Sequence, residues 1–223
     1  GNTALDSLTT GTHNTAVGHN ALTANTSANR NTAVGRHALT ANTTGEDNVG
    51  IGYHALVENT TGEDNVAVGS YALDANTTAS NNVAIGYYAL TSTVTGFNNV
   101  AVGVNALYTN TASNNTAIGR DALKLSTADN CVAVGSLALA ANSTGAANVA
   151  VGYGALNDNT TGNYNIAIGG GALDTNTTGD NNVAMGINAL TANTTADNNT
   201  AIGYDALTAN TTGHSNVAVG AYA

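Results

Sequence analysis

The 223-residue sequence contains no proline, no tryptophan, one phenylalanine and one cysteine. A single cysteine, Cys131, excludes an internal disulfide framework. Only 8% of the residues are charged, and the basic ones are Arg30, Arg36, Arg120 and Lys124. With a formal net charge of −10, the chain offers no basic surface to a phosphate backbone, so we expect no nucleic-acid partner. No stretch approaches the roughly 18 apolar residues of a membrane span.

Glycine recurs along the whole chain with an interval of 17 residues, shortened to 16 only twice. Ala follows each of these glycines after three residues and, where the chain is long enough, Leu follows after four, as in Ala21 and Leu22. Such a period is typical of a solenoid, in which one coil buries its apolar face only against the next. We therefore predict an all-β parallel β-solenoid of about 13 coils. Residues 1–223 would form one array without separate caps.

The strand of each coil is predicted just before the repeat glycine. In the segment from Asn82 to Ile85, Val83 and Ile85 lie on one face and Ala84 on the other, which is the alternation of a β-strand. We expect the Val and Ile side chains to form a column beside a second apolar column made of Leu. The recurring Ala face indicates that something packs closely against it along the chain.

The rest of the coil is predicted to contain a second short strand at Ala-Leu and a turn at Asn-Thr-Thr. The residue after this turn is Gly in some coils and Ala in others, as in Gly62 and Ala79, so small size matters there more than a left-handed backbone. The repeat glycine has no substitute. A positive φ or a very close backbone approach explains that position better.

Asparagine stands four residues before nearly every repeat glycine, and Cys131 is the exception. If coils stack at about 4.8 Å, as strands do, equivalent amides hydrogen-bond to one another in a ladder that locks the register. The predicted structural ladder consists of Asn14, Asn31, Asn48, Asn65, Asn82, Asn99, Asn115, Asn148, Asn165, Asn182, Asn199 and Asn216.

An isolated coil should not fold. Ordering 17 residues costs about 25 kcal/mol, and burying one Leu and two other aliphatic side chains recovers only part of this. Stacked coils would make a rod roughly 60 Å long. Because solenoid ends without caps present open strand edges, they favour the addition of another copy. Self-association into a head-to-tail filament is therefore one expected partner arrangement.

The strings Asn65-Val66-Ala67-Val68-Gly69 and Asn199-Thr200-Ala201-Ile202-Gly203 resemble the head repeats of YadA-like trimeric autotransporter adhesins, and related tail-fibre-like β-solenoid repeats. The likeness covers nearly every coil, although the repeat here is longer by the Asn-Thr-Thr segment. The resemblance implies a left-handed parallel β-roll, a homotrimer assembled through the small-residue face, surface exposure and adhesion.

Nine coils carry an N-glycosylation acceptor at one phase of the repeat. Sugars there would coat one edge of the coils if the chain is exported through a glycosylating system. The alternative is that Asn-Thr-Thr is turn chemistry, with Asn and Thr side chains bonding to nearby backbone. The candidates are Asn25, Asn42, Asn59, Asn76, Asn142, Asn159, Asn176, Asn193 and Asn210.

Two groups of residues are weighed as metal sites. Glu46-Asp47 and Glu63-Asp64 stand 17 residues apart and so stack on neighbouring coils, where a cation such as calcium or, by preference, solvent offsets the like charges. The second group aligns His37 and His54 with two tyrosines in an aromatic strip, for which surface packing is favoured over metal binding.

No catalytic residues, metal site or cofactor is predicted, and Cys131 is expected to be an inert thiol because no base partner is identifiable. We expect a structural subunit of an extracellular fibre or of a cell or virion surface, adhesive and glycosylated, with glycans or a host surface as further partners. Alternatives are an ice-binding β-solenoid, since threonine columns can order water, and the head of a trimeric adhesin that binds a host receptor.

Overall fold

The computed structural model describes residues 3–223, which form an all-β parallel β-solenoid of about 12 turns with a repeat of about 17 residues. The chain divides into two compact units, unit 1 (Gly1–Asn114) and unit 2 (Asn115–Ala223). The division falls inside the first of the two shortened repeats, which starts at Gly103. Among residues 3–223, no helix has the length and hydropathy that a membrane crossing requires.

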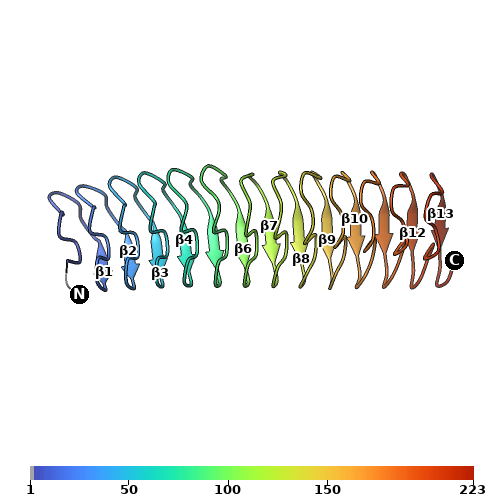
Figure 1. Cartoon of the computed structure of the whole chain (residues 1–223), viewed down its shortest axis with the longest axis horizontal. Helices are drawn as coiled ribbons and strands as arrows, with labels where there is room; N and C mark the ends of the chain where they lie inside the picture. Colours follow the sequence, from blue (N-terminus) through green and yellow to red (C-terminus); the bar gives the residue numbers. More distant parts are fainter. Residues whose placement is uncertain (1–2) are drawn as a thin grey trace. The chain divides into compact units, whose positions relative to one another are not determined.

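Each coil contributes one strand of three residues, and the strands within each unit run in the same direction (Figure 1). Unit 1 contains β1 Thr15–Val17, β2 Thr32–Val34, β3 Val49–Ile51, β4 Val66–Val68, β5 Val83–Ile85 and β6 Val100–Val102. Unit 2 contains β7 Thr116–Ile118, β8 Val132–Val134, β9 Val149–Val151, β10 Ile166–Ile168, β11 Val183–Met185, β12 Thr200–Ile202 and β13 Val217–Val219.

Neighbouring strands pair in parallel, and each residue lies beside its equivalent in the next coil. In unit 1, Val66 pairs with Val83 and Ala67 with Ala84. In unit 2, Ala167 pairs with Ala184. The predicted stacking of repeat upon repeat is confirmed, and it brings like side chains together in columns.

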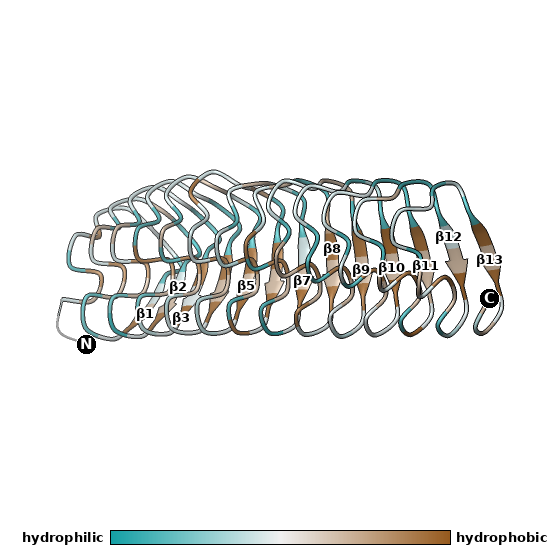
Figure 2. Cartoon of the chain, turned by 45° about the vertical axis from the view of Figure 1, so that its right-hand side comes forward, coloured by the Kyte–Doolittle hydropathy of each residue, from teal (hydrophilic) through white to brown (hydrophobic). Residues whose placement is uncertain are grey.

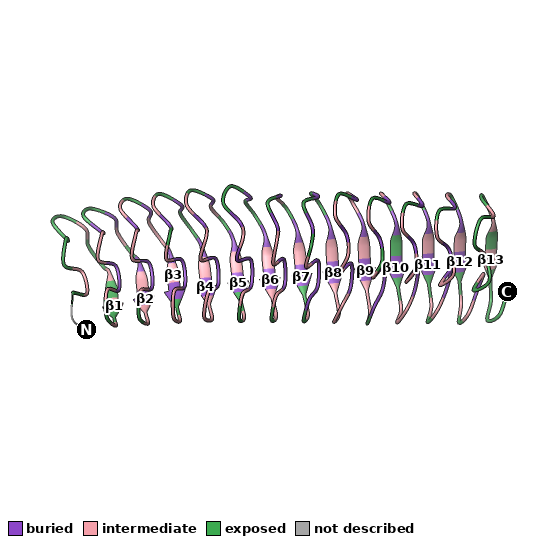
Figure 3. Ribbon diagram, viewed as in Figure 1, coloured by how far each residue is buried: buried purple, intermediate pink, exposed green. Residues whose placement is uncertain are grey.

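The strand alternation is confirmed, but the Val and Ile side chains do not lie beside the Leu column as expected. The central Ala of the strand, such as Ala84, is fully buried, whereas Ile85 is 41% exposed. Figure 2 shows brown, hydrophobic colour at the strands of most coils, and the buried central residue recurs from β2 to β12 (Figure 3). The Val and Ile columns therefore lie on the outer face of the sheet and not beside the Leu column.

The small-residue face packs inside the coil. Where Gly50 replaces the central Ala, an added Cβ would lie 3.2 Å from Leu39 Cγ. The interior is therefore too narrow for Val or Ile at this position. The resemblance implied that the small residues form a trimer contact, and this is corrected: their own coil already covers them.

The predicted second strand at Ala-Leu is absent, because this segment is a turn throughout the described residues. Its leucines have left-handed backbones, with φ of 50° at Leu73 and 52° at Leu173. Such a conformation is unfavourable for leucine. Both side chains are fully buried, so burial of the apolar side chain offsets the strain.

The repeat glycine is required for both of the reasons that the sequence offered as alternatives. At Gly69 φ is 139°, a region that side chains rarely allow, and a Cβ would lie 2.4 Å from the carbonyl oxygen of Gly86. By contrast, Gly62 after the Asn-Thr-Thr turn does not have a positive φ, which confirms that this second position selects for size.

Candidate functional site

The asparagines before the strands form a continuous buried column in unit 1, here called column A. Asn48 accepts the backbone N–H of Asn65 on Oδ1 at 3.0 Å, and its Nδ2 donates to the carbonyl of Gly62 at 2.7 Å. The main link between coils is thus side chain to backbone. A direct bond between the two amides accompanies it at Asn65 and Asn48, at 3.1 Å.

The asparagines of the Asn-Thr-Thr turns form a second column, here called column B, in which the amides bond directly to one another. Asn59 Nδ2 donates to Asn42 Oδ1 at 2.8 Å, and in unit 2 Asn159 Nδ2 donates to Asn142 Oδ1 at 2.7 Å. Sequence reasoning assigned the amide ladder to column A and overlooked column B. The recurrence of Asn at this second phase in most coils was the available signal.

Column B consists of the glycosylation candidates, and the folded coil leaves no room for a sugar there. Except for Asn210, which is half-buried, these side chains have no exposed surface. A glycan would replace a hydrogen of Nδ2, but Asn59 Nδ2 donates to both Asn42 Oδ1 and the Gly62 carbonyl. The turn-chemistry alternative fits this geometry, and glycosylation of the buried candidates does not.

The two columns meet at the carbonyl of the small residue. The Gly62 oxygen accepts hydrogen bonds from Asn48 of column A at 2.7 Å and from Asn59 of column B at 3.0 Å. This carbonyl points into the core, where an unpaired oxygen would be costly, and the two amides satisfy it. A side chain at Gly62 would place its Cβ 2.4 Å from both the Ala79 carbonyl oxygen and Asn59 Oδ1, which explains why a small residue follows the turn.

Other side chains interrupt the columns in both units. In unit 1, Thr93 replaces an asparagine of column B, and Asn76 Oδ1 in the preceding coil is buried without a hydrogen-bond partner. In unit 2, Cys131 replaces an asparagine of column A, and its thiol lies 3.4 Å from the carbonyl oxygen of Gly145. Burial raises the pKa of this thiol, which disfavours the thiolate.

The threonine pair of the turn divides between two roles. The first Thr donates its hydroxyl to the backbone of the next coil, as from Thr60 to the Thr77 carbonyl at 3.0 Å. The second, such as Thr61 or Thr78, is exposed. One exposed threonine per coil makes a single column. The ice-binding alternative would need a broader flat surface of ordered threonines.

Arg30 bridges the first of the two acidic pairs, Glu46-Asp47, and no ion pair of this kind is seen for Glu63-Asp64 among the described residues. Arg30 Nε lies 2.6 Å from Asp47 Oδ1, and Arg30 Nη2 lies 2.7 Å from Glu46 Oε2. The hydrogen bond from Arg30 lowers the pKa of Asp47. Among residues 3–223, no group of three or more metal-ligating side chains comes together.

The aromatic strip is longer than the sequence indicated, because the residue directly after the repeat glycine joins it. Tyr71 and Tyr88 stack with centroids 4.9 Å apart and planes at 16°, and Tyr53 stands across Tyr71 at 84°. The strip lies wholly in unit 1. Its members are His19, His37, Tyr53, His54, Tyr71, Tyr87, Tyr88 and Tyr108.

Left-handed residues carry half of this strip. His54 and Tyr71, two residues after their glycines, have φ of 58° and 59°. Asn and Asp recur at the same phase in other coils, as in Asn105 and Asp205. These residues tolerate a left-handed backbone, so their recurrence was a signal of the turn that sequence reasoning did not use.

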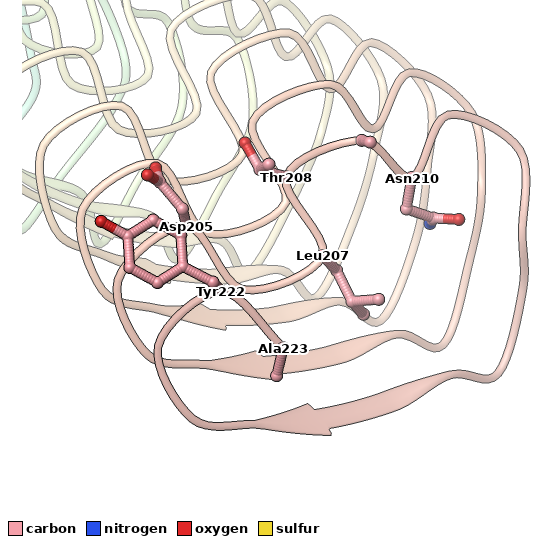
Figure 4. Close-up of a pocket in the computed structure, with 7 residues that line it drawn as sticks. Asp205, Leu207, Thr208, Asn210, Tyr222 and Ala223 are labelled. Atoms are coloured by element: carbon pink, nitrogen blue, oxygen red, sulfur yellow. The ribbon is translucent and has the colours of Figure 1, made fainter.

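A pocket of about 470 Å³ lies at the last coil of unit 2 (Figure 4). Leu207, Thr208, Tyr222 and Ala223 contribute to its wall. The leucine at the same phase one coil earlier, Leu190, is fully buried, whereas Leu207 is half-buried. The pocket is therefore the uncovered side of a coil interior and brings no group of reactive side chains together.

Comparisons of the chain with family models, with curated proteins and with solved structures return no match. The arguments that follow therefore depend on the geometry of the coils and on the sequence pattern.

Proposed function

We propose that the protein is a structural subunit of an extracellular or surface fibre and that it self-associates. The observation that carries the proposal is the in-register stacking of chemically equivalent residues in successive coils. Stacked coils of this kind form an array that extends by adding further units, each contacting only its neighbours. The resemblance to YadA-like head repeats and tail-fibre-like repeats supports a location on a cell or virion surface.

The outer strand face supports self-association. In unit 1 it presents Val17, Ile51 and Ile85, which are 56%, 38% and 41% exposed. No residue of the thirteen strands is charged. An uncharged aliphatic surface repeated on every strand favours contact with another protein surface over exposure to water. Lateral packing into a homotrimer is one arrangement of the proposed fibre, and head-to-tail addition through strand edges is the other.

The experiment is electron microscopy of the purified chain together with light scattering. Discrete particles of higher mass than one chain support the lateral arrangement, and unbounded threads support axial growth. A single species at the 22.0 kDa of one chain, up to the highest soluble concentration, would contradict the proposal.

Paired substitutions separate the two arrangements. The double variant Ile51→Lys/Ile85→Lys places charges on the outer strand face and should reduce a lateral oligomer to single chains. The matched control Thr61→Lys/Thr78→Lys adds the same charges to the exposed threonine column of the same unit. If assembly is axial, neither variant changes the particle length distribution.

A further inference from the structure

The aromatic strip of unit 1 contains two tyrosines that are not stacked on their ring neighbours. Tyr87 meets Tyr71 at 79° and Tyr88 at 63°, and it is 48% exposed. Tyr53 meets Tyr71 at 84°. By contrast, Tyr71 and Tyr88 cover one another's faces. Tyr87 is the more exposed of these two rings, whereas Tyr53 is half-buried and contacts His54 with ring centroids 4.2 Å apart at 40°.

The spacing of these two rings follows from the repeat. Each directly follows a repeat glycine, and Ser70 takes the same position in the coil between them. Two coil rises separate the rings by about 10 Å. In an extended β-1,4-linked glycan, alternate pyranose rings turn the same face to one side, and the disaccharide repeat has a similar length. The small Ser70 leaves room for the intervening sugar.

Polar side chains lie along the strip. The Arg36 guanidinium lies 5.8 Å from the Tyr53 ring centroid. Asp74 is hydrogen-bonded to Thr91 within the coils that carry the strip. Aromatic faces combined with hydrogen-bonding side chains suit sugars, which present C–H groups on one face and hydroxyls at the edge.

The charge near the strip favours a neutral glycan. Arg36 and Asp74 carry opposite charges. Burial, together with the charge of Arg36, lowers the pKa of His37, which favours its neutral form. Because the whole chain carries a net charge of −10, an acidic polysaccharide would be repelled.

The tyrosines are held in position before any ligand arrives. A hydrogen bond with Tyr87 raises the pKa of Tyr88 to about 12. Burial and a hydrogen bond with Tyr53 raise the pKa of Tyr71. Rings fixed in this way lose little freedom on binding, which favours affinity.

We propose that the aromatic strip is a binding site for a neutral β-1,4-linked glycan, whose alternate sugar rings stack on Tyr53 and Tyr87 with the chain parallel to the coil stacking direction of unit 1. Arg36 donates hydrogen bonds to hydroxyls at the Tyr53 end. The site is formed within one unit and does not depend on the proposed fibre role.

Isothermal titration of the full chain with cellohexaose and with chitohexaose tests the proposal and distinguishes the two sources of such a chain. Maltohexaose, an α-linked hexaose without the flat alternating repeat, is the ligand control. We expect binding of at least one β-linked hexaose and at least about tenfold weaker binding of maltohexaose. No binding of either β-linked hexaose, or equal binding of maltohexaose, would overturn the proposal.

Matched variants locate the site. Tyr53→Ala and Tyr87→Ala should each lower the association constant about fivefold, and the double variant more than about tenfold. The control variants Tyr153→Ala and Tyr204→Ala remove tyrosines at the same phase in unit 2, where they are 68% and 46% exposed. Far-UV circular dichroism and melting temperatures establish that all five variants fold. An equal loss of binding in the unit 2 variants would overturn the assignment.

Discussion

Units 1 and 2 are built from the same repeat, yet they differ at the two positions after each glycine. Unit 1 has histidine and tyrosine there in successive coils, such as His37, His54 and Tyr71, and these rings contact one another. Unit 2 has Gly170 and Gly171 in one coil, and an isolated pair of rings, Tyr204 and Tyr222, at its end. The comparison teaches that the scaffold is independent of these positions, which are free to carry specificity.

The units also differ in where their asparagine columns are broken. Column A is continuous through unit 1 and is interrupted in unit 2 by Cys131. Column B is interrupted in unit 1 by Thr93 and in unit 2 by Ser126, which accepts a hydrogen bond from Asn142 at 3.3 Å. Ser126 thus still bonds within column B. Thr93 instead donates to the Asn110 carbonyl at 2.9 Å and leaves Asn76 Oδ1 unpaired.

The largest expected effect tests whether the two units share one backbone geometry. Gly69→Ala in unit 1 and Gly169→Ala in unit 2 force a Cβ to 2.4 Å from the carbonyl oxygen of the next coil, at φ of 139° and 135°. Each should lower the free energy of unfolding by more than about 3 kcal/mol, measured by denaturant titration.

The control for this comparison is Gly62→Ala. Its added Cβ also lies 2.4 Å from a carbonyl oxygen, that of Ala79, but φ is not positive and alanine occurs at this phase in other coils. We expect a cost of about 1 kcal/mol or less. Equal losses in Gly62→Ala and Gly69→Ala would mean that the contact, and not the backbone conformation, requires the repeat glycine.

A smaller effect is expected from repairing the column breaks. Thr93→Asn provides a donor for the buried, unpaired Asn76 Oδ1 and should stabilise unit 1 by about 1 kcal/mol. Cys131→Asn restores column A in unit 2 and should stabilise it by a similar amount. The reverse change, Asn65→Cys in unit 1, should destabilise by about 1 kcal/mol, as read from thermal melting. Destabilisation by both repairs would contradict the role assigned to the columns.

The smallest expected effect distinguishes the tyrosines of the two units by the pH at which they ionise. Hydrogen bonding to Tyr87 raises the pKa of Tyr88 to about 12, so the folded state favours neutral Tyr88. Its contribution to stability is complete below the ordinary tyrosine pKa of about 10 and is lost as the pH rises through 12. Tyr87→Phe should move the tyrosinate absorbance transition of Tyr88 toward 10.

Tyr204→Phe in unit 2 is the matched control for this titration. The charge of Asp205 is the main cause that raises the pKa of Tyr204, and no hydrogen bond to the strip of unit 1 is involved. The high-pH transition should therefore remain in Tyr204→Phe. If the high-pH transition disappeared in Tyr204→Phe, it would belong to Tyr204 of unit 2 and not to Tyr88 of unit 1.

The sequence predicted much of one coil because its signals are local. The alternation of Val83, Ala84 and Ile85 specified a strand, and the fixed interval between glycines specified a parallel register. The conformation of Leu73 was not predictable in this way, because leucine has no preference for a left-handed backbone and adopts one only where the buried side chain compensates.

The candidate site also has one part that the sequence predicted and one part that only the structure revealed. Period alone placed His37, His54, Tyr71 and Tyr88 in one strip. The contribution of Tyr53 became visible only from ring angles across the coils. For the acceptor asparagines such as Asn59, the same sequence is compatible with an exposed glycosylation motif and with a buried hydrogen-bonded column. Only the burial of the side chain distinguishes the two.

By itself, the sequence determined the repeat, the position of the strand and the stacking of like residues, since each follows from spacing along the chain. Tertiary structure alone decided which strand face is the interior. Ala84 lies inside and Ile85 outside because the coil is narrow: an added Cβ at Gly50 already lies 3.2 Å from the Leu39 side chain. That width depends on how all the residues of the coil close, and no local pattern encodes it.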